Sequence, residues 1–378
     1  MRMLKLILGC WLALALSCLP AFPLEGENLR PAGPAPESSD TLADIGRPPM
    51  FQIPSTQQNQ RLEKIARELN KLLADGHDAS GRVQFKEHDY GNGTSCYVIL
   101  KLDGKKIGKL KPDGNATGFI EPEVNFWQLM RIFQHEEIAP PSAYVKVGKW
   151  GQDQFVENTK SAMTRVYRRR NRLVLLKRIA ANQGRPMRFA IKLTEDATIN
   201  CPELCSPNIN EINHQHPLVR LLMADGPRPS NLPFYFDARH HNSELELARQ
   251  LSTALVADRL QGEWDRWGGR NTELLEDGAL TNLAWFDDGG ASFQKIDFHH
   301  TFYSSVFRFD PLVVRRVREM DDFLKGATGE FLGVRRKEDL RDSLGIFQEP
   351  SWSNFQDNLH SVCRLVDDRV RTAHSLLQ

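Results

Sequence analysis

The sequence lacks the short motifs that identify several large classes of enzyme. It contains no nucleophile elbow, no Walker loop and no dinucleotide-binding fingerprint, and it shows no internal repeat. Its net charge is only +1 over 378 residues, so the overall field gives no reason to expect a nucleic-acid partner. After residue 19, no apolar run approaches the length of a membrane span. We therefore expect no transmembrane helix in the mature chain.

Cysteine is also scarce, with six residues in the whole chain. An even number of cysteines in an oxidising compartment permits disulfide bonds. Cys201 and Cys205 are close enough in sequence to pair locally, whereas Cys96 can pair with Cys363 only if the fold brings them together. A zinc site in the loop at 201–205 needs two further ligands, and the nearby histidines fit known zinc spacings poorly.

The first 21 residues have the order of a secretory signal peptide. Two basic residues open the chain, an apolar run covers residues 6–19, and Pro-rich sequence follows. The run is too short for an ordinary membrane span, and its alternative is an N-terminal core helix. Cleavage is expected after Ser17 or Ala21, and a poor lipobox before Cys18 keeps an N-terminal tether open. We expect an exported protein, either periplasmic, secreted or in the secretory pathway.

The next two regions differ sharply in composition. Residues 22–57 are rich in Pro, Gly, Ser and Glu, which predicts a linker that is mostly disordered. Apolar residues at helical spacing then predict a helix over residues 59–74, ended by Gly76. Strands are predicted at 82–86, 96–102, 107–111 and 143–147, with a helix at about 123–134. Residues 58–150 should therefore form a small lobe, built from an antiparallel sheet and one packed helix.

From residue 151 onward the pattern becomes longer and more helical. Helices are predicted at 165–179, 244–260, 311–324 and 352–376, with a hairpin whose strands cover 284–286 and 294–298. The expected fold class is therefore α+β, with a small β-rich N-lobe at 58–150 and a larger helical C-lobe at 151–378.

Three segments, each at the end of a predicted strand or helix, carry the residue types that phosphoryl transfer needs. A Lys neutralises the nucleotide phosphates, a Glu holds that Lys, an Asp meets the acceptor hydroxyl, and an Asn and a second Asp hold metal. These roles are filled, in the required order, by Lys111, Glu123, Asp265, Asn271 and Asp297. Each residue alone has an ordinary explanation, such as a solvated strand Lys or a helix-start carboxylate. Their common order favours a phosphotransferase site.

The expected site lies between the two lobes. A groove between a β-rich lobe and a helical lobe is a natural place for ATP. Lys109 stands two residues before Lys111 on the same predicted strand and is a second candidate for binding the nucleotide. We expect ATP with Mg²⁺ or Mn²⁺ as cofactors.

Several of these segments resemble the secretory-pathway kinases, the group of the Golgi casein kinase and the proteoglycan xylosyl kinase. Leu110 to Pro112 resembles the Lys-Pro that ends the third strand in that family. Glu123 to Ile132 resembles a helix of the family that runs into a double-Pro turn, here at 140–141. Asp258 to Asn271 resembles the catalytic loop, and Ile296 with Asp297 resembles the metal-binding segment. A more distant similarity extends to phosphoinositide kinases and HipA-like kinases.

The resemblance implies a two-lobed, protein-kinase-like fold that transfers phosphate from ATP to a hydroxyl on a secreted protein or glycan. It covers the N-lobe and the three motif segments. The loop departs from the family, because Trp267 replaces a His and the interval from Asp265 to Asn271 is one residue longer. Two alternatives therefore stay open: a catalytically inactive, kinase-like binding protein, and an enzyme of the same fold that transfers AMP.

Overall fold

A computed structural model describes residues 50–76, 79–86, 97–113, 120–160, 169–182, 184–193, 198–200, 212–223, 243–262, 272–275, 284–286 and 306–376. All of them belong to one compact unit, Thr41–Gln378. The predicted signal peptide, the linker up to residue 49 and Cys96, Cys201 and Cys205 lie outside the described residues. Cys363 is a free, buried thiol.

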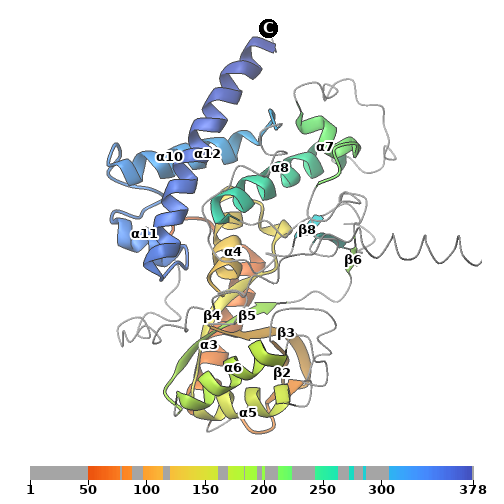
Figure 1. The fold of residues 1–378 in the computed structure, drawn as a ribbon, viewed down its shortest axis with the longest axis vertical. Helices are drawn as coiled ribbons and strands as arrows, with labels where there is room; N and C mark the ends of the chain where they lie inside the picture. Colours follow the sequence, from red (N-terminus) through yellow and green to blue (C-terminus); the bar gives the residue numbers. More distant parts are fainter. Residues whose placement is uncertain are drawn as a thin grey trace, which may run out of the picture. The chain divides into compact units, whose positions relative to one another are not determined.

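The N-lobe is built on a five-stranded antiparallel sheet (Figure 1). Its strands are β1 (Val83–Lys86), β2 (Val98–Leu102), β3 (Lys105–Pro112), β4 (Ser142–Val147) and β5 (Met187–Leu193). Their order across the sheet is β1-β2-β3-β5-β4. Alternate residues of β1 and β2 are buried, as expected for strands with one face on a core. The four strands predicted in this region are confirmed.

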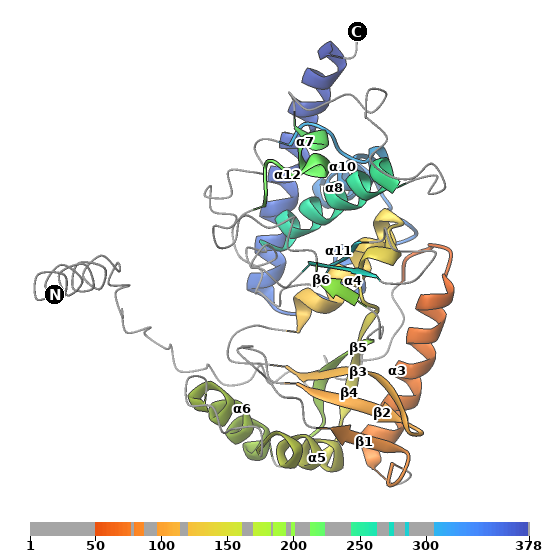
Figure 2. The ribbon, with the colours of Figure 1, turned by 90° about the vertical axis from the view of Figure 1, so that its right-hand side faces the viewer.

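The strand β5 was missed by the sequence analysis, and it corrects the expected extent of the N-lobe. It pairs with β3 on one side and with β4 on the other, so it is an inner strand of the sheet. The sheet therefore includes residues beyond position 150, where the sequence analysis placed the lobe boundary. Between β4 and β5 the chain forms α5 (Lys149–Lys160) and α6 (Arg169–Ala181), which lie at the end of the lobe away from α4 (Figure 2).

The helix α3 (Gln57–Asp75) precedes the sheet and packs along β4 (Figure 2). The side chain of Thr56 caps its first turn, and Gly76 ends it in the left-handed conformation. Its apolar stripe, including Leu69 and Leu73, is buried in the core. The end of the predicted linker differs from expectation, because Phe51 is buried and packs edge-on against Phe331. Burial of a large aromatic side chain against another ring favours an ordered segment here.

The helix α4 (Glu121–Phe133) lies between the sheet and the C-lobe, and every one of its residues is buried. It is followed by the short 3-10 helix η1 (Glu136–Ile138). On its far side α4 contacts α8 (Ser243–Gln261) and α10 (Pro311–Lys325). A helix covered on all sides cannot swing without breaking contacts with both lobes.

The described part of the C-lobe is mainly helical, as predicted. Besides α8 and α10 it contains α7 (Pro217–Leu222), α11 (Lys337–Ser343) and α12 (Glu349–Leu376). A small sheet joins β6 (Thr198–Asn200), β7 (Thr272–Leu275) and β8 (Ala284–Phe286). The strand predicted at 284–286 is present and pairs with β7, while its expected partner at 294–298 lies outside the described residues. No helix among the described residues is long and apolar enough to cross a membrane.

Candidate active site

The side chain of Lys111 forms an ion pair with Glu123 across the junction of β3 and α4. Lys111 lies one residue before the end of β3, where it pairs in register with Ala190 of β5. Its side chain is only 11% exposed, which excludes the ordinary explanation of a solvated strand lysine. The predicted ion pair is therefore present, and both of its ends are fixed by regular structure.

The carboxylate of Glu123 is almost entirely removed from solvent, with 1% of its side chain exposed. It stands in the first turn of α4, where the positive end of the helix dipole favours a negative charge. Its second oxygen, Oε2, is buried and has no hydrogen-bond partner among the described residues. A buried carboxylate oxygen of this kind is the type of ligand that Mg²⁺ or Mn²⁺ prefers, but it is a single ligand, and the other expected ligands, Asn271 and Asp297, lie outside the described residues.

Lys109 lies two residues before Lys111 on β3, and alternation along the strand places both side chains on the same face. Its ammonium group lies 5.1 Å from the centre of the Tyr97 ring, a cation–π contact. The structure thus pairs Lys111 with Glu123 and places Lys109 on the same face of β3.

The remaining candidates, Asp265, Asn271 and Asp297, lie outside the described residues. The described chain stops at Gly262, just after α8, and the end of that helix is tied to α4. Gln261 donates one hydrogen bond to the carbonyl of Pro122, at 2.7 Å, and another to Asn125, at 3.0 Å. Among the described residues, no group of three His, Cys, Asp or Glu side chains is arranged to hold a metal ion.

Three charged residues near this pair were missed by the sequence analysis. Arg188 of β5 donates to Asp113 through Nη2, at 2.6 Å, and lies 3.5 Å from Glu121. Burial raises the pKa of Glu121 to about 7, against the opposing effect of Arg188. Glu121 carried a sequence signal, since it opens the same helix as Glu123. Arg188 carried none, because its partners are distant in sequence.

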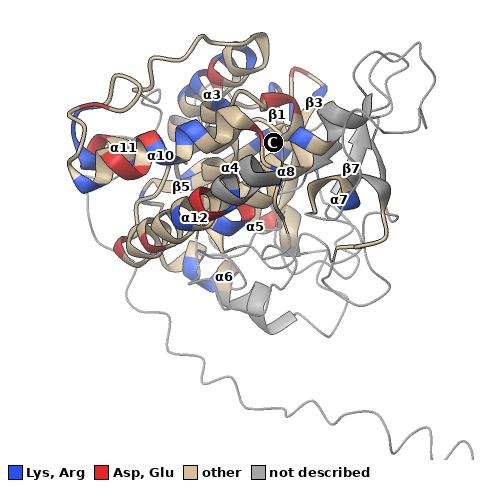
Figure 3. Ribbon diagram, turned by 90° about the horizontal axis from the view of Figure 1, so that it is seen from above, with Lys and Arg blue, Asp and Glu red and all other residues tan. Residues whose placement is uncertain are grey.

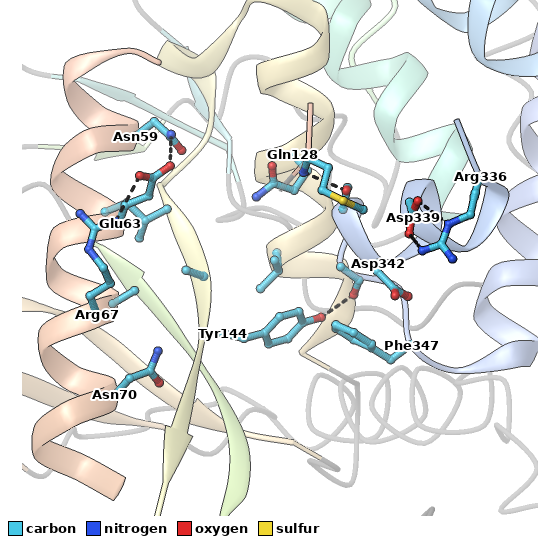
Figure 4. A pocket seen from close by; sticks show the side chains of 17 residues that line it. Asn59, Glu63, Arg67, Asn70, Gln128, Tyr144, Arg336, Asp339, Asp342 and Phe347 are labelled. Atoms are coloured by element: carbon cyan, nitrogen blue, oxygen red, sulfur yellow. Dashed lines mark hydrogen bonds and ion pairs between the residues drawn. The ribbon is translucent and has the colours of Figure 1, made fainter. Parts of the chain in front are cut away.

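A cavity of about 370 Å³ lies between α3, α4, β4 and α11 (Figure 4). Tyr144 and Phe347 meet at its wall, with their ring centres 5.3 Å apart. Acidic and basic residues occur together on α11 at its rim (Figure 3), and Arg336 there pairs with Asp339. Neither Lys111 nor Glu123 lines this cavity.

A scan against known protein families finds no match, and a search of curated proteins also finds none. A search of solved structures does find similar chains. The Golgi casein kinase with Mn/ADP bound matches with a TM-score of 0.50 and 12% identity, over 82% of this chain and 76% of that one. A second structure of the Golgi casein kinase gives a TM-score of 0.52 at 12% identity, over 84% and 76%.

The chain has the kinase-like fold of the Golgi casein kinase. The expected α+β, two-lobed fold class is thereby confirmed, and at 12% identity the likeness concerns the fold alone. A structure of hydra Fam20 with sugar also matches, with a TM-score of 0.49 and 12% identity over 84% of this chain and 91% of that one.

Proposed function

We propose that this protein is a metal-dependent kinase that transfers phosphate from ATP to a hydroxyl group of a secreted protein or glycan. The observation that supports it most is the buried ion pair between Lys111 and Glu123 within a kinase-like fold. Burying two opposite charges costs desolvation energy that their attraction does not reliably repay. A lysine that is held in such a pair, at the junction of a strand and a helix, is well placed to neutralise phosphates there.

The remaining roles follow the order of the sequence. Lys111, held by Glu123, would neutralise the nucleotide phosphates, with Lys109 beside it on β3. Asp297 and Asn271 would hold Mg²⁺ or Mn²⁺, which neutralises charge on the transferring phosphate. Asp265 would accept the proton of the acceptor hydroxyl.

The compartment and the acceptor are part of the same proposal. Basic residues followed by an apolar run at the N-terminus favour export. An exported enzyme encounters secreted proteins and glycans, whose hydroxyl groups are the proposed acceptors. The Golgi casein kinase has a similar fold. Because the Golgi belongs to the secretory pathway, this similarity supports a secretory-pathway location for the present chain. A direct tether at the N-terminus is the alternative to full release.

Mass spectrometry of candidate acceptors distinguishes the proposed kinase from its two alternatives. The full mature chain is incubated with ATP, acceptor proteins or glycans, and either Mg²⁺ or Mn²⁺. A phosphate adduct that requires metal supports the kinase, and an AMP adduct identifies an AMP-transferring enzyme. Nucleotide binding without any adduct identifies a catalytically inactive binding protein. Absence of both nucleotide binding and adducts overturns the proposal.

A further inference from the structure

The two residues of the ion pair are flanked in sequence by members of a second, largely buried charge network. Asp113 lies two residues after Lys111, and Glu121 lies two residues before Glu123. Arg188 lies between these flanking carboxylates. Its Nε and Nη2 atoms donate to one oxygen of Asp113, at 3.0 and 2.6 Å, and Nη2 lies 3.5 Å from Glu121.

The position of Arg188 is fixed from several directions. Its side chain is 11% exposed, and its guanidinium lies over two aromatic rings, 5.0 Å from the centre of Tyr144 and 4.5 Å from that of Phe347. The backbone N–H of Asp113 also donates to the carbonyl of Arg188, at 3.1 Å. Stacking on two rings and hydrogen bonding to a carboxylate already restrict this planar cation. It therefore loses little further conformational entropy when it contacts both of its carboxylate partners.

The same network reaches the C-lobe. One oxygen of Glu121 accepts hydrogen bonds from the backbone N–H groups of Phe347 and Gln348, both at 3.1 Å. These two residues immediately precede α12, so the buried carboxylate of Glu121 also meets the positive end of that helix dipole. The hydroxyl of Tyr144 donates to the carbonyl of Gly345, at 2.6 Å, and adds a second link to the same segment.

We propose that Arg188 is a positioning residue, which holds Lys111 and Glu123 together by bridging Asp113 on the β3 side and Glu121 on the α4 side. Contacts of Glu121 with residues 347–348 anchor this bridge to the C-lobe. The inference rests on the proposed nucleotide site for its functional consequence. Its structural content, a link between the end of β3 and the start of α4, is independent of that function.

The functional arm measures the dissociation constant of Mg-ATP by calorimetry on the full mature chain. Arg188→Met removes the charge and keeps the length, so we expect the dissociation constant to rise tenfold or more. Arg188→Lys keeps the charge without the fork and should fall between this variant and the parent. Leu175→Ala is the control, because Leu175 is a buried core residue of α6 outside the network. It should lower the melting temperature and change the dissociation constant less than twofold.

A double-mutant cycle separates positioning from a general loss of stability. If Arg188 acts through the ion pair, Arg188→Met should change the dissociation constant less than twofold in a Glu123→Gln background. An equal loss in both backgrounds overturns the proposal. Asp113→Asn weakens the same bridge from a partly exposed position, and it replaces Arg188→Met if that variant does not fold.

The structural arm measures hydrogen exchange without nucleotide. In Arg188→Met, peptides covering residues 105–113 and 123–133 should exchange at least tenfold faster than in the parent, and in Leu175→Ala they should not. Unchanged exchange in Arg188→Met overturns the proposal whatever the affinity. If the parent chain binds no Mg-ATP, the proposed function fails, while the exchange experiment still decides whether the bridge exists.

Discussion

Lys111 and Lys109 stand two residues apart on one strand, and burial is what distinguishes them. Lys111 is nine-tenths enclosed and paired with Glu123, whereas Lys109 is partly exposed beside an aromatic ring. A buried ammonium without its carboxylate would lose its charge or pull in water. The two residues of the pair therefore depend on each other.

We expect Lys111→Met to abolish measurable binding of Mg-ATP, because it removes the positive charge nearest the expected phosphates and leaves Glu123 buried and unpaired. Fluorescence titration with a labelled ATP analogue tests this. Lys105→Met, at the exposed start of β3, is the matched control and should bind like the parent. Tight binding by Lys111→Met would place the nucleotide elsewhere.

The two aspartates assigned to the C-lobe should behave differently from each other. Asp297→Ala should abolish metal-dependent ATP binding as well as transfer, because a hard cation needs oxygen ligands. Asp265→Ala should keep nucleotide binding and slow transfer by a factor on the order of a hundred or more. Calorimetry with ATP and metal, paired with a transfer assay, measures both. If Asp297→Ala binds metal and ATP like the parent, its assignment is wrong.

Among the elements, the junction of η1 with α8 and α10 holds a buried, charged histidine. His135 lies 2.9 Å from Glu137 and 3.7 Å from Asp310, which caps α10. Arg249 of α8 also lies 3.5 Å from Asp310. Burial lowers the pKa of His135, but the two carboxylates outweigh it and raise that pKa to about 9.

This raised pKa predicts how stability depends on pH. The protonated histidine contributes fully below its unfolded pKa of about 6.5, and its contribution is lost as pH rises through about 9. The free energy of unfolding should therefore fall across this window, by at most about 3 kcal/mol from this group. Urea unfolding of the parent and of His135→Gln, measured at several pH values, tests it. Equal slopes for the two proteins would contradict the prediction.

At the scale of the whole molecule, the buried helix α4 joins the two lobes, because it contacts the large sheet as well as α8 and α10. Its polar side chains bond to separate parts of the C-lobe, as when Asn125 donates to the carbonyl of Leu344, at 3.1 Å, and accepts from Gln261 of α8. The expected active-site groups come from segments that precede and follow this helix in the sequence. The site therefore depends on how the lobes are joined.

The chain is also expected to lose its N-terminal segment during export. N-terminal sequencing of secreted material should find a start between Cys18 and Gly26, because small residues follow the apolar run there. Replacing the apolar run with polar residues is the control and should stop export. Exported protein that still begins at Met1 would contradict the prediction.

The sequence by itself determined the features that depend on local patterns. Periodicity predicted α3, α8, α10 and α12 and four strands of the large sheet, and the order of residue types at a strand end and the next helix start predicted the pair of Lys111 with Glu123. Only the tertiary structure decided what depends on distant contacts. It inserted β5 between β3 and β4, buried Phe51, and joined Arg188 to Asp113 and Glu121. Partners many residues apart leave no periodic trace in sequence, because burial in the folded chain alone brings them together.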